Sequence, residues 1–389
     1  MKKIKPKLTQ RFMYGLDKIR MNSFTKQTYS FKPTPFDIKG PFIVAASRIS
    51  SADQYLIMLS FKEFMCFTFN EGIYRTNPEI AKRQDFYGNI PYKIGYPIET
   101  YKDQLVKLVK DGNNVCIYPE MYTNYSGVTS PIDPDVAEII KEANCTLVTY
   151  CFTGGYFTEP AWAKDKRKGW INGHIVNVYS KFDLEKLTNA QVTKLLEDDL
   201  KEDAYARQCN SPITYASDHL AEGLENVFYI CPNCGEYDSY ETSGKDYHCT
   251  KCDARGSYTD QGIIHANFRF KTVTDFMKWE ENQIDRIADS EINFNEDDVT
   301  LSQIKDNHHL KKITTDKMHV DKDGISVGFH TFLFNDIQKV EVDDKATSLV
   351  FSHNNEYYKL TSPTLKPLKY RKLFYKRKEA IRLYGIGPK

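Results

Sequence analysis

Four cysteines in the second half of the chain have the spacing of a metal site. Two residues separate Cys231 from Cys234 and Cys249 from Cys252, and fourteen residues lie between the pairs. Such spacing lets each turn point two sulfurs at one ion, and two turns complete a tetrahedron. Four thiolates leave no open coordination position, so the pattern predicts a structural zinc ribbon with a hairpin across residues 239–248. A ribbon can also bind nucleic acid or protein, and that role stays open.

Polar residues that follow two apolar runs form a second candidate site. The run 41–46 leads into Arg48 and Asp53, and the run 114–118 leads into Glu120. Strand ends are where α/β sheets place their chemistry. Alternatives remain for the first pair, because Asp53 could simply begin the next helix, and Arg48 could be a surface charge or the partner of Asp53.

The order of these blocks resembles the phospholipid and glycerol (1-acylglycerol-3-phosphate type) acyltransferase family, in its bacterial branch with a C-terminal zinc ribbon. The resemblance runs from about residue 36 to residue 260. The family's first motif is a histidine with an aspartate five positions later, and it maps onto Arg48 and Asp53, with Ser47 and Ser50 at the flanking polar positions. In the family the histidine takes the proton from a glycerol hydroxyl as it attacks an acyl thioester, and the aspartate orients the imidazole. Arg48 cannot accept that proton, because a guanidinium stays protonated.

The second motif of the resemblance is also altered. Glu120 is kept, but Met121 stands where the family has glycine, and Thr123 stands where it has arginine. Glycine admits a phosphate close to the backbone and arginine binds it bidentately, so both devices are absent. Lys93 occupies the place of a further substrate-binding motif and could offer phosphate a point charge. The resemblance therefore implies Arg48 and Asp53 at the catalytic positions and Lys93, Glu120 and Thr123 as substrate-binding residues.

What the resemblance implies is transfer of an acyl group from coenzyme A or acyl carrier protein to a lysophospholipid or glycerol phosphate. Replacement of the histidine base implies that this activity is impaired or absent, as in a pseudoenzyme. One alternative is a non-catalytic lipid or acyl-carrier binding protein. Another is a scaffold in which the zinc ribbon recruits protein or nucleic acid.

Charge is uneven along a chain whose net charge is only +1. Residues 1–33 hold nine Lys and Arg against one acid, and residues 366–389 hold nine against one. In the first segment, Leu8, Phe12, Leu16 and Ile19 recur at helical spacing among basic residues, a pattern typical of a helix on an anionic lipid surface. Packing of this stripe on the main domain is the alternative. Nucleic acid is not the favoured partner.

The sequence contains no apolar run of 18 or more residues and no secretory signal pattern, so we expect a cytoplasmic protein that could be peripheral on the inner face of the membrane. The 389 residues suffice for two or three domains. We expect an α/β fold with an acyltransferase-type mixed sheet flanked by helices, then the zinc ribbon, then a small β-rich, pleckstrin-homology-like C-terminal domain. The predicted segments are a basic amphipathic lead (1–35), the α/β domain (36–226), the ribbon (227–260), a helical linker (261–304) and a module of seven short strands with a C-terminal helix (305–389).

Overall fold

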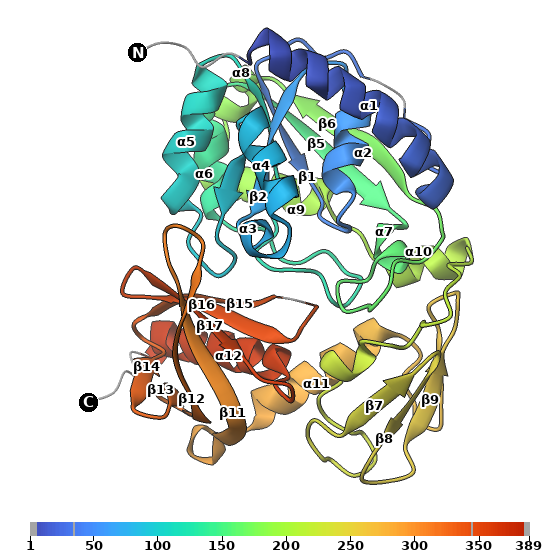
Figure 1. Cartoon of the computed structure of the whole chain (residues 1–389), viewed down its shortest axis with the longest axis vertical. Coiled ribbons are helices and arrows are strands. Elements are labelled where there is room, and N and C mark those ends of the chain that lie inside the picture. Colours follow the sequence, from blue (N-terminus) through green and yellow to red (C-terminus); the bar gives the residue numbers. More distant parts are fainter. Residues whose placement is uncertain (1–5, 34–35, 344, 385–389) are drawn as a thin grey trace. The chain divides into compact units, whose positions relative to one another are not determined.

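The chain divides into two compact units in a computed structural model, which describes residues 6–33, 36–343 and 345–384. The first unit comprises residues 1–92, 98–161 and 165–217, and the second comprises residues 93–97, 162–164 and 218–389. A mixed sheet lies in the first unit, and two antiparallel sheets lie in the second (Figure 1). Parts of the predicted basic lead (1–5 and 34–35) and the last five residues of the predicted C-terminal module fall outside the described residues.

The six-stranded sheet of the first unit has the order β3-β2-β4-β1-β5-β6. All neighbours pair in parallel except β6, which runs antiparallel to β5. The central strands are continuous apolar runs, as expected for parallel strands covered on both faces. The strands are β1 (Phe42–Ala46), β2 (Met65–Asn70), β3 (Ile90–Tyr92), β4 (Asn114–Ile117), β5 (Thr146–Thr153) and β6 (Asn172–Tyr179).

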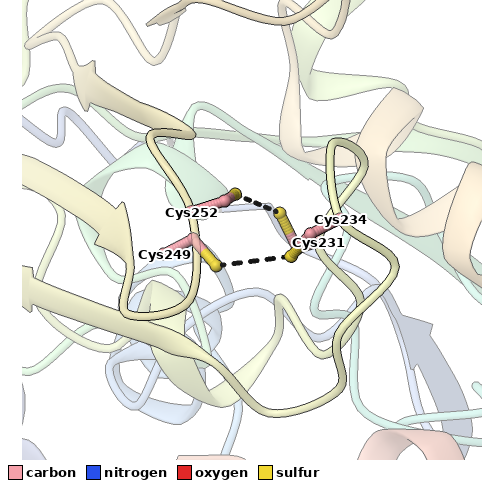
Figure 2. Close-up of side chains that lie close together, drawn as sticks. All are labelled: Cys231, Cys234, Cys249 and Cys252. Carbon is pink, nitrogen blue, oxygen red and sulfur yellow. Dashed lines mark hydrogen bonds between the residues drawn. The ribbon is translucent and has the colours of Figure 1, made fainter.

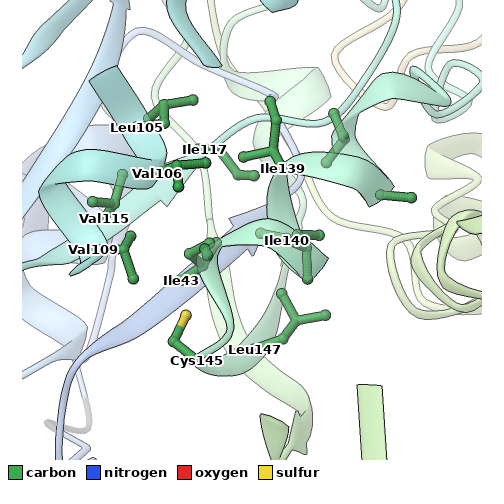
Figure 3. Close-up of a cluster of buried hydrophobic side chains, with 14 of the residues drawn as sticks. Ile43, Leu105, Val106, Val109, Val115, Ile117, Ile139, Ile140, Cys145 and Leu147 are labelled. Carbon is green, nitrogen blue, oxygen red and sulfur yellow. The ribbon is translucent and has the colours of Figure 1, made fainter. Parts of the chain in front are cut away.

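Helices cover both faces of this sheet. Ile43 of β1 packs with Leu147 and with apolar residues of α5 and α6 on one face (Figure 3), and Phe42 and Val44 pack with residues of α1 and α2 on the other. This alternation along β1 makes the unit a three-layer α/β/α structure. The helices are α1 (Leu8–Tyr29), α2 (Asp53–Ser60), α3 (Ile73–Thr76), α4 (Pro78–Tyr87), α5 (Glu99–Lys110), α6 (Asp135–Ala143), α7 (Gly155–Thr158), α8 (Lys181–Glu185), α9 (Asn189–Asp199) and α10 (Ala204–Asn210).

The second unit contains the cysteine-bearing sheet, whose order is β10-β9-β8-β7. The hairpin predicted across 239–248 is confirmed, since Tyr240 pairs with Cys249 and Ser243 pairs with Asp246 around Gly244 and Lys245. The elements are the 3-10 helix η1 (Leu224–Asn226), β7 (Tyr240–Ser243), β8 (Asp246–Cys249), β9 (Arg255–Tyr258), β10 (Ile264–Ala266) and α11 (Val273–Arg286).

A seven-stranded antiparallel sheet and a long helix complete this unit. The sheet has the order β14-β13-β12-β11-β17-β16-β15. A likeness to pleckstrin-homology domains stays an architectural prediction. The elements are the 3-10 helix η2 (Asp289–Glu291), β11 (Asn293–Ile304), β12 (Leu310–Asp321), β13 (Gly324–Val327), β14 (His330–Leu333), β15 (Ile337–Asp343), β16 (Ser348–His353), β17 (Glu356–Thr361) and α12 (Pro367–Tyr384).

The prediction of a helical linker over residues 261–304 is wrong for the second half of that segment. Residues 261–304 are helical over α11 and at the 3-10 turn η2, but β11 belongs to the seven-stranded sheet. A bulge between Glu296 and Val299 breaks the period of two, so the acidic strand does not alternate clearly in the sequence. The strands of the C-terminal module are not all short as predicted, since β12 has 12 residues. No helix among the described residues is both long enough and apolar enough to span a bilayer.

Candidate functional site

Arg48 and Glu120 meet at one edge of the mixed sheet. Strands β1 and β4 are parallel neighbours, so the residues that follow their carboxyl ends lie side by side. The backbone N–H of Arg48 donates to Oε1 of Glu120 at 2.8 Å, and the N–H of Ser130 donates to Oε2 at 3.2 Å. The predicted strand-end site therefore brings its two blocks into direct contact.

Asp53 binds the same turn from the other side. Its Oδ2 accepts the N–H of Ile49 at 2.7 Å and the N–H of Ser50 at 3.1 Å, and its Oδ1 accepts the Ser50 hydroxyl at 2.6 Å. Three successive amides, at positions 48, 49 and 50, are thus held by two carboxylates, and we call this arrangement the carboxylate clamp. Asp53 is also the first residue of α2, so it does begin a helix, but its carboxylate faces the turn.

Both carboxylates of the clamp have raised pKa values. Burial raises the pKa of Asp53, which is only 2% exposed, to about 7 although the hydrogen bonds from Ser50 and Ile49 oppose it. Burial likewise raises the pKa of the half-buried Glu120 to about 7, against the amides of Arg48 and Ser130. Carboxyl groups with pKa values near neutral pH are typical of functional sites.

The side chain of Arg48 lies among aromatic rings. Its guanidinium carbon is 5.6 Å from the ring centre of Tyr92 and 6.0 Å from that of Tyr118, and it donates to the Tyr92 hydroxyl. These contacts are cation–π interactions and hold the cation in place. In the described part of the chain, the guanidinium forms no ion pair with a carboxylate within 4.0 Å. A fixed cation thus occupies the position at which the resemblance implies a base.

No histidine replaces that base locally. His174 is the single histidine in residues 1–217, and it lies on β6, two strands away from β1. Burial and the charge of Arg207 lower its pKa. The clamp therefore has carboxylates and a cation but no imidazole.

The remaining predicted substrate-binding residues are placed differently. Thr123 is half-buried in the loop after β4, and Met121, in the same loop, donates its N–H to Pro131 at 2.8 Å. Lys93 belongs to the second unit, where its ammonium lies 3.5 Å from Asp306, so the structure does not place it relative to the clamp. Sequence analysis missed Ser130 as a donor to Glu120, because a backbone donor ten residues onward leaves no side-chain signal.

The four predicted metal ligands converge in the second unit (Figure 2). The sulfurs of Cys231, Cys234, Cys249 and Cys252 all lie within 4.8 Å of one another, with 3.6 Å between Cys231 and Cys252 and 3.9 Å between Cys234 and Cys249. A tetrahedral ion with bonds of about 2.3 Å needs sulfurs about 3.8 Å apart. The cluster could therefore hold a metal ion such as zinc.

Further groups orient the cysteine loops. The Ser239 hydroxyl lies 3.2 Å from the sulfur of Cys249, and the N–H of Lys251 donates to that sulfur at 3.4 Å. Glu280 of α11 is fully buried, and its Oε1 accepts the N–H groups of Tyr229 at 2.5 Å and Ile230 at 2.8 Å, directly before Cys231. Such outer contacts fix the geometry of a metal site.

Helix α1 turns its apolar stripe outward. Leu8, Phe12, Leu16 and Ile19 are 84%, 66%, 45% and 73% exposed, so the alternative in which this stripe packs on the main domain is wrong. The buried face instead carries Asp17, which accepts from Arg83 at 2.7 Å and Tyr87 at 2.5 Å. The helix is thus anchored by its polar face.

The chain matches no protein-family model, and a search of curated proteins finds no match. Among solved structures it is similar to the 1-acyl-sn-glycerophosphate (LPA) acyltransferase of Thermotoga maritima, at 16% sequence identity and a TM-score of 0.40, over 49% of this chain and 77% of that chain. A likeness this weak carries no argument about the function of this chain.

The fold and the sites define a mixed α/β protein with additional antiparallel sheets and a four-cysteine cluster that could hold a metal ion. The finer assignment to acyl-transfer chemistry depends on the clamp.

Proposed function

We propose that the first unit holds an acyltransferase-type site for a lysophospholipid or glycerol phosphate and an acyl thioester of coenzyme A or acyl carrier protein. Turnover at this site is impaired or absent, because Arg48 takes the position of the general base. The carboxylate clamp is the observation that supports the proposal most directly. It joins the two sequence blocks that carry the resemblance, with Glu120 bound to the amide of Arg48.

Arg48 determines what the site can still do. Loss of a positioned base typically lowers the rate about a hundredfold to ten-thousandfold. A permanent cation stacked on tyrosine rings can instead attract the phosphate of a lipid headgroup. Binding is therefore retained more readily than catalysis, and a non-catalytic lipid or acyl-carrier binding protein is the second candidate.

The exposed stripe of α1 supports a membrane surface as partner. Arg11 and Arg20 are exposed on the same helix as the apolar stripe, and so is Lys7 directly before it. Basic side chains beside exposed apolar ones suit the headgroup region of an anionic bilayer. We accordingly propose a cytoplasmic protein that docks on the inner face of the membrane through α1.

The cysteine cluster is proposed as a structural zinc site. When bound, zinc would crosslink the two cysteine loops and stabilise the fold of the ribbon. The four thiolates of the cluster fill a tetrahedral coordination sphere, so the cluster serves folding rather than acyl transfer. A scaffold role for the ribbon, recruiting protein or nucleic acid, is the third candidate.

One experiment separates these candidates. The purified full chain is extracted for mass spectrometry of bound lipid, and acyl transfer from a labelled acyl-coenzyme A to a lysophospholipid is measured in parallel. Slow transfer that disappears in Asp53→Asn supports the impaired enzyme, and bound lipid without transfer supports the binding protein. Neither bound lipid nor transfer, together with a salt-dependent gel shift on nucleic acid, would support the scaffold instead.

A further inference from the structure

A second group of reactive side chains lies beside the clamp, at Ser51. The Ser51 hydroxyl lies 3.0 Å from Oε2 of Glu159 and 2.6 Å from the ammonium of Lys166. The ammonium is also 3.5 Å from Glu159. Because an ammonium only donates hydrogen bonds, the hydroxyl must donate to the carboxylate, which is the orientation a serine needs to lose its proton.

The local fold holds these groups together. Ser51 directly follows the clamped amides 48–50, and its own N–H donates to Oε2 of Glu159 at 3.1 Å. Glu159 is the C-cap residue directly after the short helix α7, whose first residue, Gly155, packs against Ile49 so closely that any larger side chain would collide. Close packing of α7 on the turn thus fixes the carboxylate at the hydroxyl.

A buried tyrosine hydroxyl of the same unit is influenced by carboxylates of both sites. Tyr29, at the end of α1, is fully buried, and its hydroxyl has no hydrogen-bond partner among the described residues. Burial and the charges of Glu159 and Asp53 raise its pKa, so this hydroxyl stays a donor. A polar ligand group that reached this hydroxyl would give it an acceptor.

We propose that Ser51 is a nucleophile that takes the acyl group from the thioester, with Glu159 as its base and Lys166 holding the oxygen. This inference rests on the proposed thioester donor. The Ser51 oxygen forms an ester bond with the acyl carbon as its proton passes to Glu159. The carbon–sulfur bond breaks, and the thiolate leaves as a thiol with that proton. The acyl group then moves to a lipid hydroxyl or to water, which regenerates the serine.

The test is intact-protein mass spectrometry of the full chain after incubation with palmitoyl-coenzyme A. We expect one added acyl group on the peptide containing Ser51, retained in neutral hydroxylamine, which cleaves cysteine thioesters. Ser51→Ala should lose this adduct, whereas Ser23→Ala, at an exposed serine of α1, should keep it. Glu159→Gln still offers an oxygen to the Ser51 N–H but not a base, so acylation should slow about a hundredfold or more while the protein stays folded.

The outcomes separate this inference from the proposed function. A wild-type chain without an adduct at Ser51, or an adduct that persists in Ser51→Ala, overturns the nucleophile. If Ser51→Ala transfers acyl groups to lysophospholipid as fast as the wild type, the inference fails and the proposed function stands. If Ser51 is acylated but no lysophospholipid binds or accepts the acyl group, the nucleophile stands and the proposed acceptor fails.

Discussion

The backbone amide of Arg48 donates to Oε1 of Glu120 at 2.8 Å, although 72 positions separate the two residues. This contact exists because the parallel strands β1 and β4 end at the same edge of the sheet. It holds the turn that carries Arg48, the residue at the position where the resemblance implies a histidine base. The following predictions test this geometry and its surroundings.

Stability should depend on pH through Asp53. Its folded-state pKa of about 7 exceeds its ordinary value of 3.8, so between about pH 4 and pH 7 the folded protein keeps a proton that the unfolded chain has lost. The free energy of unfolding should therefore fall as pH rises through this window, by up to about 1.4 kcal/mol per pH unit, and level off above it. Urea denaturation at pH 5 and pH 7.5 measures this fall.

Asp53→Asn is the matched variant for that measurement. The asparagine oxygen can still accept the two amides, but the side chain does not titrate. The variant should lose about 1 to 3 kcal/mol less than the wild type between pH 5 and pH 7.5. Equal losses in both proteins would contradict a buried, proton-holding Asp53.

Exposed apolar residues of α1 should control membrane binding. Phe12→Ser combined with Ile19→Ser should lower binding to vesicles containing anionic lipid at least tenfold, because it removes two of the four exposed apolar side chains that would enter the bilayer. Phe182→Ser is the control, since Phe182 is 62% exposed on α8, much as Phe12 is 66% exposed on α1. Sedimentation with vesicles measures the change, and a loss in the control equal to that in the α1 variant would contradict docking by α1.

Glu280 should support the first cysteine loop. Glu280→Ala leaves two buried N–H groups without an acceptor and should lower the free energy of unfolding by roughly 2 to 4 kcal/mol. Glu280→Gln keeps an oxygen acceptor and should cost much less. Both effects are read from denaturant unfolding with zinc bound, and from the rate of zinc release to a chromogenic chelator. Similar behaviour of the two variants would show that hydrogen bonding to the loop is unimportant.

Removal of the metal should unfold the ribbon locally. Without the ion, the four cysteine sulfurs, which lie within 4.8 Å of one another, take up protons and the two loops lose their crosslink. Chelation should therefore raise amide hydrogen exchange across 231–252, while the mixed sheet of the first unit stays protected. Unchanged exchange in the ribbon after complete metal removal would contradict the structural site.

The sequence predicted the strand-end site and the cysteine ligands because local spacing encodes both. Local spacing could not predict which basic side chains of the chain are paired with carboxylates. The basic helix α12 suggested a charged terminus, but Arg371 pairs with Glu341 and Lys369 with Glu296, partners far away in the sequence. Lys378 in turn donates to the carbonyl of Ile337 at 2.7 Å. Several basic side chains of α12 thus form ion pairs and hydrogen bonds inside the second unit.

Other features were hidden for related reasons. The direction of the apolar stripe on α1 depends on which face Asp17 anchors, and periodicity alone gives no sign of that choice. The sequence did not predict Ser51 as a reactive residue, because its partners Glu159 and Lys166 lie more than a hundred positions away along the chain. Tertiary contacts, rather than local pattern, select these groups.

The central claim is that a lipid acyl-transfer site persists with its base replaced by Arg48. The most direct measurement is the rate of acyl transfer from labelled acyl-coenzyme A to lysophospholipid by Arg48→His combined with Met121→Gly and Thr123→Arg. We expect this triple variant to exceed the wild type at least about a hundredfold, because it restores the base and the phosphate contacts. A triple variant that folds and binds lipid but transfers no faster than the wild type would contradict the account.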